Sequence, residues 1–457
     1  MKNNLLMDFA KYVSLNVLGM LGLSCYILAD TFFTSARLGT NGLAALNIAI
    51  SIYSVIHATG LMLGIGGATK YSIFQSQNQS FQANNIFTIT VLLGFGFGVL
   101  FVLIGLTASS SIAWLLGARG TILEMTGTYL KTILCFGPFF LLNQIFLAFV
   151  RNDHAPRLSM LGMIVGSLSN IVLDYVFMFP LNMGIFGAAL ATGLAPIISM
   201  LILSRHRIAQ KNHFHFSLIS FSFSKIFPIF GLGISSFINE ISSAIVLIVF
   251  NLLILQAAGN TGVAAYGIVA NLALVALAIF TGIAQGAQPL TSRLYGQGQS
   301  KNAHKILKYS IVVSVSLGVV LYSIVFLFTN DLVSIFNSEN DAFLAQLAFE
   351  GLRIYFIGFL FVGVSIVSAA YLAATERPKP SFIISIVRGA VAILVFAIAF
   401  SSLWGIHGIW LSFPTSELVT VVLSVLLIRR TISQKSSRIK SLHFENTMDE
   451  KGGNKNG

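Results

Sequence analysis

The chain has 457 residues, of which 56% are hydrophobic and only 9% are charged, and its mean hydropathy is +0.85. Soluble domains are about 25% charged, so this composition excludes a soluble globular protein. Apolar runs of about 20 residues recur along the chain and predict membrane-spanning helices, whereas the short alternating segments of a transmembrane barrel do not occur. Cys25 and Cys135 both fall within apolar runs, which argues against a disulfide framework or a zinc site.

The apolar runs predict an all-α polytopic membrane protein with twelve transmembrane helices. An N-terminal six-helix lobe (residues 1–204) is followed by a basic linker (205–228), a C-terminal six-helix lobe (229–428) and a polar tail (429–457) that we expect to be disordered. The spans of the first lobe are expected at 9–34, 43–69, 86–108, 129–150, 158–179 and 185–204. Those of the second lobe are expected at 229–258, 262–285, 309–329, 352–374, 381–402 and 406–428.

The formal net charge of +12 is concentrated in the loops of one predicted face. If the N-terminus is cytoplasmic, about 22 of the 27 Lys and Arg residues lie on the cytoplasmic side, as the positive-inside rule requires. The basic charge then reflects topology and contact with anionic lipid rather than binding of nucleic acid. In the linker, the pair His213 and His215 is too weak a signal for a metal site, so a basic stretch along the membrane surface is the better interpretation.

Short motifs of the first half recur in the second half at a nearly constant offset of about 220 residues. Gly39-Thr-Asn-Gly matches Gly259-Asn-Thr-Gly, and Gly184-Ile-Phe-Gly matches Gly405-Ile-His-Gly. Six spans per repeat insert in the same direction, so the lobes should be related by a pseudo-two-fold axis along the membrane normal. A cavity between two such lobes suits alternating access, and the duplication therefore favours a transporter over a channel.

Four oxygen-bearing side chains fall at a similar depth in three spans of the first lobe. At 1.5 Å of rise per residue, Asp30, Asp174, Thr192 and Asn170 lie roughly 6, 8, 10 and 14 Å from the outer ends of their spans. Such oxygen ligands suit a hard cation such as Na⁺, and two neighbouring carboxylates also suit proton storage. The alternative is that the two aspartates only hydrogen-bond to neighbouring helices. The second lobe has no equivalent set at the repeat offset.

The second lobe has charged residues of its own within its spans. Glu240 and Glu417 both fall about 16 Å from the starts of their spans, near the membrane midplane. Together with Arg388 they could form a second proton or substrate site; alternatively, one glutamate pairs with Arg388 and has a purely structural role. His57 in the second span is better interpreted as a hydrogen-bonded packing residue than as a proton relay.

Several motifs, in one order over about residues 1–430, resemble the multidrug and toxic compound extrusion (MATE) family. They are Ala29-Asp30-Thr-Phe-Phe, Asn170-Ile-Val-Leu-Asp174, Gly184-Ile-Phe-Gly-Ala-Ala-Leu-Ala-Thr192, and Gln288-Pro289-Leu290 with Tyr295-Gly296. The bacterial branch that includes DNA-damage-inducible protein F and the staphylococcal multidrug exporter is the most similar. The resemblance implies a V of two lobes in the bacterial cytoplasmic (inner) membrane, with both termini in the cytoplasm, that exports lipophilic and often cationic drugs in exchange for Na⁺ or H⁺.

The resemblance also implies roles for individual residues. The coupling cation would bind at Asp30, Asn170, Asp174 and Thr192, with Na⁺ as the one metal and no further cofactor. Glu240 matches an acidic position that other branches use. The first span contains no proline, so the proline-centred kink of some relatives is not assumed.

The sequence thus favours an antiporter for small organic cations, acting as a monomer in the bilayer, and it predicts no catalytic residue. A flippase for a lipid-linked sugar has the same architecture and is the alternative, but it needs a strongly basic cavity, and Arg388 is the one arginine expected to be clearly buried. An intramembrane aspartyl protease would need a Gly-rich motif around Asp30 or Asp174. Neither aspartate has one, and the chain carries no P-loop for ATP.

Overall fold

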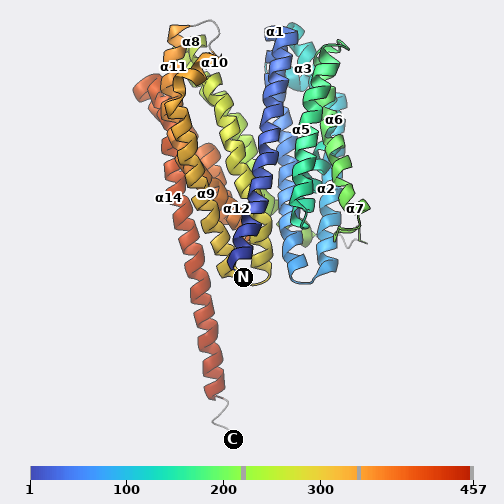
Figure 1. Ribbon diagram of the computed structural model, residues 1–457, viewed down its shortest axis with the longest axis vertical. Helices are drawn as coiled ribbons and strands as arrows, with labels where there is room; N and C mark the ends of the chain where they lie inside the picture. The colour runs from blue at the N-terminus through green and yellow to red at the C-terminus, as the bar shows by residue number, and fades with distance from the viewer. Residues whose placement is uncertain (1, 218–222, 337–340, 453–457) are drawn as a thin grey trace.

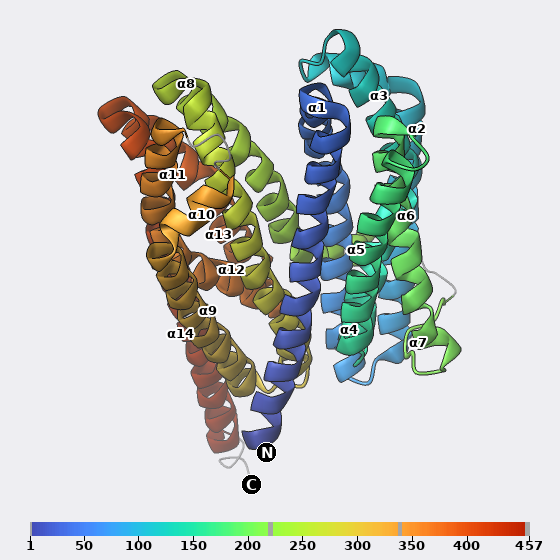
Figure 2. The ribbon, with the colours of Figure 1, turned by 45° about the horizontal axis from the view of Figure 1, so that its top comes forward.

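The computed structural model describes residues 2–217, 223–336 and 341–452, and these residues form helices and connecting segments without a strand. The helices gather in two bundles that meet at one end and separate toward the other, which gives the V shape of Figures 1 and 2. The N-terminal end of α1 lies where the bundles meet. We call this the closed end, and the opposite end the open end.

The N-terminal lobe contains seven of the helices. They are α1 (Lys2–Ser76), α2 (Ser80–Leu115), α3 (Gly120–Cys135), α4 (Gly137–Asn152), α5 (Pro156–Met178), α6 (Gly184–Leu203) and α7 (Arg205–Ile208). The C-terminal lobe contains α8 (Phe223–Gly296), α9 (Ser300–Leu327), α10 (Thr329–Phe336), α11 (Ala342–Tyr355), α12 (Phe359–Ala374), α13 (Pro378–Ile386) and α14 (Ala392–Gly452). A 3₁₀ turn (Phe356–Gly358) joins α11 to α12, and a π-helical turn (Val387–Val391) joins α13 to α14.

Three long helices each contain two spans because a glycine interrupts them. Gly39 in α1 has φ 63° and ψ −154°, Gly259 in α8 has φ 64° and ψ −159°, and Gly405 in α14 has φ 57° and ψ −133°. Residues with a Cβ avoid this conformation, so the glycines of the repeated motifs allow the chain to turn back. Helices α3 and α4 meet at a 51° bend and form one broken span. With α11–α12 and α13 plus the first part of α14 as single spans, the described residues form the predicted twelve spans.

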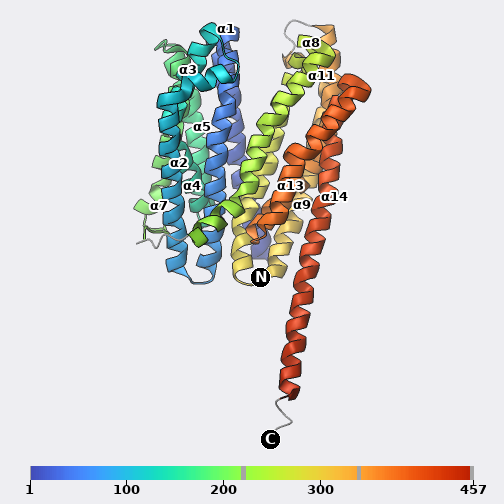
Figure 3. The ribbon, with the colours of Figure 1, turned by 180° about the vertical axis from the view of Figure 1, so that it is seen from behind.

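Each lobe has its own hydrophobic core, and each core includes the first turns of the other lobe. Phe9, Tyr12 and Val13 of α1 pack into the core of the C-terminal lobe. Ile229 of α8 packs into the core of the N-terminal lobe, and Figure 3 shows the first turns of α8 beside that lobe before the helix crosses over. Positions 9 and 229 are separated by the repeat offset, so the exchange of first turns follows the pseudo-symmetry of the sequence.

Close backbone contacts make the closed end a tight seam between α1 and α8. A Cβ atom added to Gly66 would lie 2.0 Å from the carbonyl oxygen of Ile229, and one added to Gly233 would lie 1.9 Å from that of Met62. Any side chain at these two positions would push the helices apart. The seam therefore depends on glycine in both lobes.

The connection between the lobes is ordered along most of the predicted linker. Helix α7 is followed by an extended segment that runs to Ser217, and α8 begins at Phe223. Residues 218–222 of the predicted linker and 453–457 of the predicted tail lie outside the described residues. Helix α14 continues through much of the tail to Gly452, and the disorder expected from the composition of the tail stays a prediction.

Candidate functional site

The four oxygen-bearing residues predicted for the N-terminal lobe are all buried. Asp30 comes from α1, Asn170 and Asp174 from α5, and Thr192 from α6, with exposed fractions of 7%, 0%, 0% and 5%. Helix α5 packs against both α1 and α6, and Asn170 and Asp174 are one turn apart on it. The structure therefore brings the predicted side chains together from three helices inside one lobe.

The carboxamide of Asn170 joins its neighbours in the cluster. In one orientation, its Nδ2 donates to Thr192 Oγ1 at 3.4 Å. Rotated by 180°, Nδ2 donates to Asp174 Oδ2 at 3.0 Å, while Oδ1 accepts from the backbone N–H of Thr192 at 3.2 Å. The second orientation satisfies both ends of the amide, so we favour it.

Two carboxylate oxygens in this cluster remain without a donor. Oδ1 of Asp30 and Oδ1 of Asp174 are buried, and no group among the described residues donates a hydrogen bond to them. The two aspartates interact electrostatically, and Tyr129 of α3 lies in the same environment. Buried acceptors without donors are costly, and a bound cation supplies the missing positive charge. Carboxylate, amide and hydroxyl oxygens are the donor types that suit Na⁺, and the same carboxylates can accept H⁺.

The charged residues predicted within the spans of the C-terminal lobe have different partners. Arg388 lies in the π-helical turn, and its Nε is 3.0 Å from Glu417 Oε1. Glu417 also accepts a hydrogen bond from Ser365 at 3.3 Å. Glu240 contacts the other lobe, where its Oε1 lies 3.1 Å from His57 Nδ1. Glu417 therefore has an arginine partner within its lobe, whereas the partner of Glu240 is across the interface.

Aromatic rings surround the contact between His57 and Glu240. His57 stacks on Tyr53 at 5.9 Å, and Tyr53 meets the edge of Phe140 at 5.5 Å. The Tyr53 hydroxyl also shares a 2.9 Å hydrogen bond with Tyr26. The side chain of Glu240 is 34% exposed and that of His57 only 10%. An accessible carboxylate beside aromatic rings provides the two features that bind organic cations.

A set of buried polar side chains at the closed end was not predicted from the sequence. Arg151, the residue after the predicted span 129–150, is only 2% exposed, so the expectation that Arg388 is the one clearly buried arginine was wrong. One terminal nitrogen of Arg151 donates to Asn16 Oδ1 at 2.7 Å and to Gln285 Oε1 at 3.0 Å. The available signal was a pair of amides, Gln285 and Gln288, three positions apart at the end of an apolar span.

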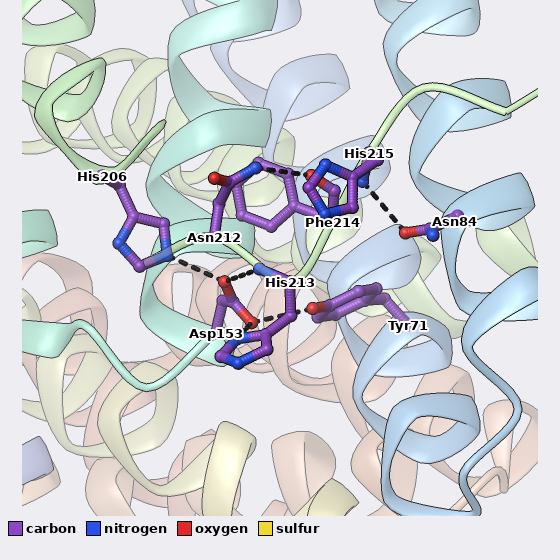
Figure 4. Close-up of polar contacts among 8 residues, drawn as sticks. All are labelled: Tyr71, Asn84, Asp153, His206, Asn212, His213, Phe214 and His215. Atoms are coloured by element: carbon purple, nitrogen blue, oxygen red, sulfur yellow. Dashed lines mark hydrogen bonds and ion pairs between the residues drawn. The ribbon is translucent and has the colours of Figure 1, made fainter. Parts of the chain in front are cut away.

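The predicted linker is bound to the N-terminal lobe through Asp153, which follows α4 (Figure 4). The carboxylate accepts hydrogen bonds from the Tyr71 hydroxyl (2.8 Å), the backbone N–H of His213 (2.8 Å), and ring nitrogens of His206 (2.8 Å) and His213 (3.0 Å). Burial alone raises the pKa of Asp153, but these hydrogen bonds outweigh burial and lower it below its usual value. Among the described residues, no group of three or more His, Cys, Asp or Glu is placed to hold a metal.

The MatE family model matches residues 17–176 and 232–399, one stretch in each lobe. The chain belongs to the MATE family. MATE proteins are transport proteins, and the predicted family and the predicted all-α fold of two six-helix lobes are confirmed. The chain is accordingly a multi-pass membrane protein.

Curated MATE relatives include two exporters from staphylococci. Multidrug export protein MepA of Staphylococcus saprophyticus is 28% identical over 412 residues, which cover 88% of this chain and 89% of that protein. The protein of the same name from Staphylococcus aureus (strain MSSA476) is 26% identical over 412 residues, which cover 88% of this chain and 89% of that protein.

Solved MATE structures have the same fold. A structure described as an outward-facing multidrug resistance MATE transporter matches with a TM-score of 0.88 at 22% identity, covering 93% of this chain and 96% of that one. A MATE complex with MaL6 matches with a TM-score of 0.89 at 23% identity, covering 94% of this chain and 97% of that one. A transporter of the MOP superfamily from Pyrococcus furiosus, described as having a binding pocket of reverse polarity, matches with a TM-score of 0.87 at 22% identity over 93% and 95%. At such identities these matches show the fold alone.

Proposed function

We propose that this MATE protein exports lipophilic, often cationic, drugs and toxic small molecules by alternating access, in exchange for Na⁺ or H⁺. The curated relatives, named as multidrug exporters, support the substrate class over most of the chain length. The observation that carries the coupling is the buried pair Asp30 and Asp174, whose free Oδ1 atoms lie in the lobe that does not contain Glu240. Ion and drug thus have separate carboxylates.

The coupling cation binds in the N-terminal lobe. Asp30 and Asp174 supply negative charge, and Asn170 and Thr192 position Asp174 and add neutral oxygens. When one Na⁺ or H⁺ binds at the two carboxylates, it cancels one of their two negative charges, so their electrostatic repulsion is relieved and the α1, α5 and α6 helices can pack more closely. The three helices therefore prefer one arrangement when the cation is bound and another when it is absent. This difference couples the binding of the ion to the motion of the lobe.

Drug binds between the lobes at Glu240. Its carboxylate is accessible and is held by His57, a residue that is charged only when protonated. An organic cation is attracted to the carboxylate and to the neighbouring rings, and it displaces His57 from Glu240. In this proposal Glu417 and Arg388 form a structural pair.

The closed end faces the cytoplasm in this proposal. It carries the N-terminus and the basic linker, and the positive-inside rule places such segments in the cytoplasm. The V then opens to the outside of a bacterial cytoplasmic membrane, with both termini inside. Two lobes of one chain enclose the whole pathway, so a monomer is sufficient.

The alternative, a lipid-linked sugar flippase, is disfavoured by the charge between the lobes. A pyrophosphate needs a basic cavity, whereas Arg388 is paired with Glu417, and Arg151 is buried among amides at the closed end. At the aromatic part of the interface the accessible charge is the carboxylate of Glu240, and Lys70, a basic residue that also reaches the other lobe, is paired with Glu376.

Dye efflux from proteoliposomes tests the proposal. Purified protein should move ethidium outward against its gradient when an inward Na⁺ or H⁺ gradient is imposed, and the two gradients applied separately identify the coupling ion. Transport without either gradient, or transport of a lipid-linked sugar in place of ethidium, would overturn the proposal.

A further inference from the structure

Three consecutive residues at the end of α4 contact three different parts of the protein. Arg151 binds Asn16 and Gln285, and Asn152 binds Gln288. Asp153 binds the linker. All three are at most 3% exposed. One short segment therefore makes contacts with the C-terminal lobe and with the chain that connects the lobes.

The contacts of Arg151 and Asn152 cross the seam to α8. Asn152 Nδ2 donates to Gln288 Oε1 at 3.0 Å, and Gln288 Nε2 donates to Thr69 Oγ1 at 2.8 Å. The Arg151 guanidinium lies 3.0 Å from Gln285 Oε1. Each of these three bonds joins the second span of α8 to the N-terminal lobe. They must break when the closed end opens.

The acceptors of Arg151 are neutral amides. A guanidinium stays charged in proteins, and its hydrogen bond to a neutral amide is weaker than a buried ion pair. Water that enters an opening seam can replace the amide oxygens of Asn16 and Gln285. A glutamate in place of Gln285 would instead pair with Arg151 and resist separation. The neutral partners therefore suit a contact that has to open and close.

The contacts of Asp153 stay within one side of the molecule. Tyr71 belongs to α1, His206 to α7 and His213 to the linker, so none of its partners lies in the C-terminal lobe. Figure 4 shows these donors converging on the carboxylate. Separation of the lobes breaks none of these bonds.

Beyond Asp153, the linker is attached to α2 in a regular pattern. The backbone N–H of His215 donates to Asn84 Oδ1 at 2.9 Å, and that of Ser217 donates to Thr88 Oγ1 at 3.1 Å. Phe214, between His213 and His215 in the chain, is 8% exposed and packs against Phe87 with a distance of 4.7 Å between ring centroids. Alternate residues thus bind through the backbone, as in a strand added to a surface. The chain up to Ser217 is structurally part of the N-terminal lobe.

We propose that Arg151, Asn152 and Asp153 are positioning residues that form a two-part lock at the closed end. Arg151 and Asn152 make the separable contacts that hold the outward-open state, and Asp153 keeps the linker fixed to the N-terminal lobe throughout the cycle. The inference rests on the proposed alternating access.

Inter-lobe distances test the separable part of the lock. Cys25 and Cys135 are replaced by serine, and spin labels are placed at the exposed positions Gln79 and Gln297 of the closed end. Thr121 and Ser402 serve as a second pair at the open end. In lipid nanodiscs, Gln288→Ala should add a population with longer closed-end and shorter open-end distances. Unchanged distances in this variant and in Asn152→Ala would overturn the proposal.

A variant that adds a charge should change the closed-end distance in the opposite direction to Gln288→Ala. Simple destabilisation of the protein would not produce this opposite change. Gln285→Glu creates an ion pair with Arg151, so it should narrow the closed-end distance distribution and slow ethidium efflux at least tenfold. The double variant Arg151→Gln/Gln285→Glu removes the pair and should restore the longer distances. A Gln285→Glu protein that opens more readily than wild type would refute the lock.

Amide hydrogen exchange tests the fixed part. Residues 213–217 should be protected in both conformations of the wild-type protein, and Asp153→Asn should raise their exchange at least tenfold without moving the closed-end distance. If the amide exchange of residues 213–217 rises whenever the closed end opens, the linker is not fixed to the N-terminal lobe and the role proposed for Asp153 is wrong. The distances and the exchange are measured without drug, so they test the lock independently of the proposed function. If the lock behaves as described but the protein transports no drug, only the proposed function is refuted.

Discussion

Nδ1 of His57 lies 3.1 Å from Oε1 of Glu240, and this contact joins the two lobes of the transporter. The carboxylate is one-third exposed and the imidazole is nearly buried. A group that binds an incoming cation must be reachable and must not be bound too tightly to its resident partner. A histidine, unlike an arginine, is an ion-pair partner only when protonated, so Glu240 meets both conditions.

Glu240→Gln should weaken the binding of ethidium by about tenfold, which corresponds to about 1.4 kcal/mol. The amide keeps the size of the side chain and removes its charge, so the fold should be preserved. Fluorescence titration of detergent-purified protein measures the affinity. Glu124→Gln is the matched control, because Glu124 is exposed. Glu417→Gln is unsuitable as a control because it would break the pair of Glu417 with Arg388. Equal affinity in wild type and Glu240→Gln would remove Glu240 from the drug site.

Asp174→Asn should retain ethidium binding and lose ethidium transport against a gradient. The substitution removes one of the two buried charges and leaves Glu240 unchanged, so coupling fails while recognition remains. Proteoliposome efflux with an imposed ion gradient gives the transport rate, and titration gives the affinity. Gradient-driven efflux at the wild-type rate would exclude Asp174 from coupling.

The cluster around Asp174 was predictable because its geometry is local. Asn170 and Asp174 are four positions apart, and the depths of Asp30 and Thr192 follow from the rise of a helix. Likewise, Gly39 and Gly259 were paired by the repeat, and both adopt the same positive-φ conformation. Helical periodicity and self-similarity are enough for features of this kind.

The contacts between the lobes were not predictable for the opposite reason. Arg151 and Gln285 are 134 positions apart, and their meeting depends on how two bundles are docked in one conformation. No periodicity within a helix contains that information. Arg151 follows a predicted span in the sequence, and only its contacts with Asn16 and Gln285 show why it is buried.

Gly233→Ala should loosen the closed end. The added methyl would lie 1.9 Å from the carbonyl oxygen of Met62, so the helices must move apart, and overpacking of this kind costs about 1–3 kcal/mol. We expect a lower Tm and a longer closed-end distance between labels at Gln79 and Gln297. Gly267, at which a Cβ would meet nothing within 4 Å, is the matched control for Gly→Ala in the same helix. Equal effects of the two substitutions would show that the seam is not tight at Gly233.

The stability that Asp153 contributes should persist down to about pH 5 and be lost in acid. Burial alone raises the pKa of this carboxyl, but hydrogen bonds from His206, the His213 backbone and Tyr71 outweigh burial, so the net pKa is below the unfolded value near 3.9. A lowered folded pKa means that the contribution is present above the unfolded pKa and is lost as the pH falls through the folded pKa. The side chains of His206 and His213 also face this carboxylate, at 2.8 and 3.0 Å. The difference in Tm between wild type and Asp153→Asn should therefore hold to about pH 5 and shrink below about pH 4, as measured by thermal unfolding at a series of pH values. A difference that already shrinks between pH 7 and pH 5 would show that Asp153 titrates in the physiological range and does not hold the linker as a permanent anion.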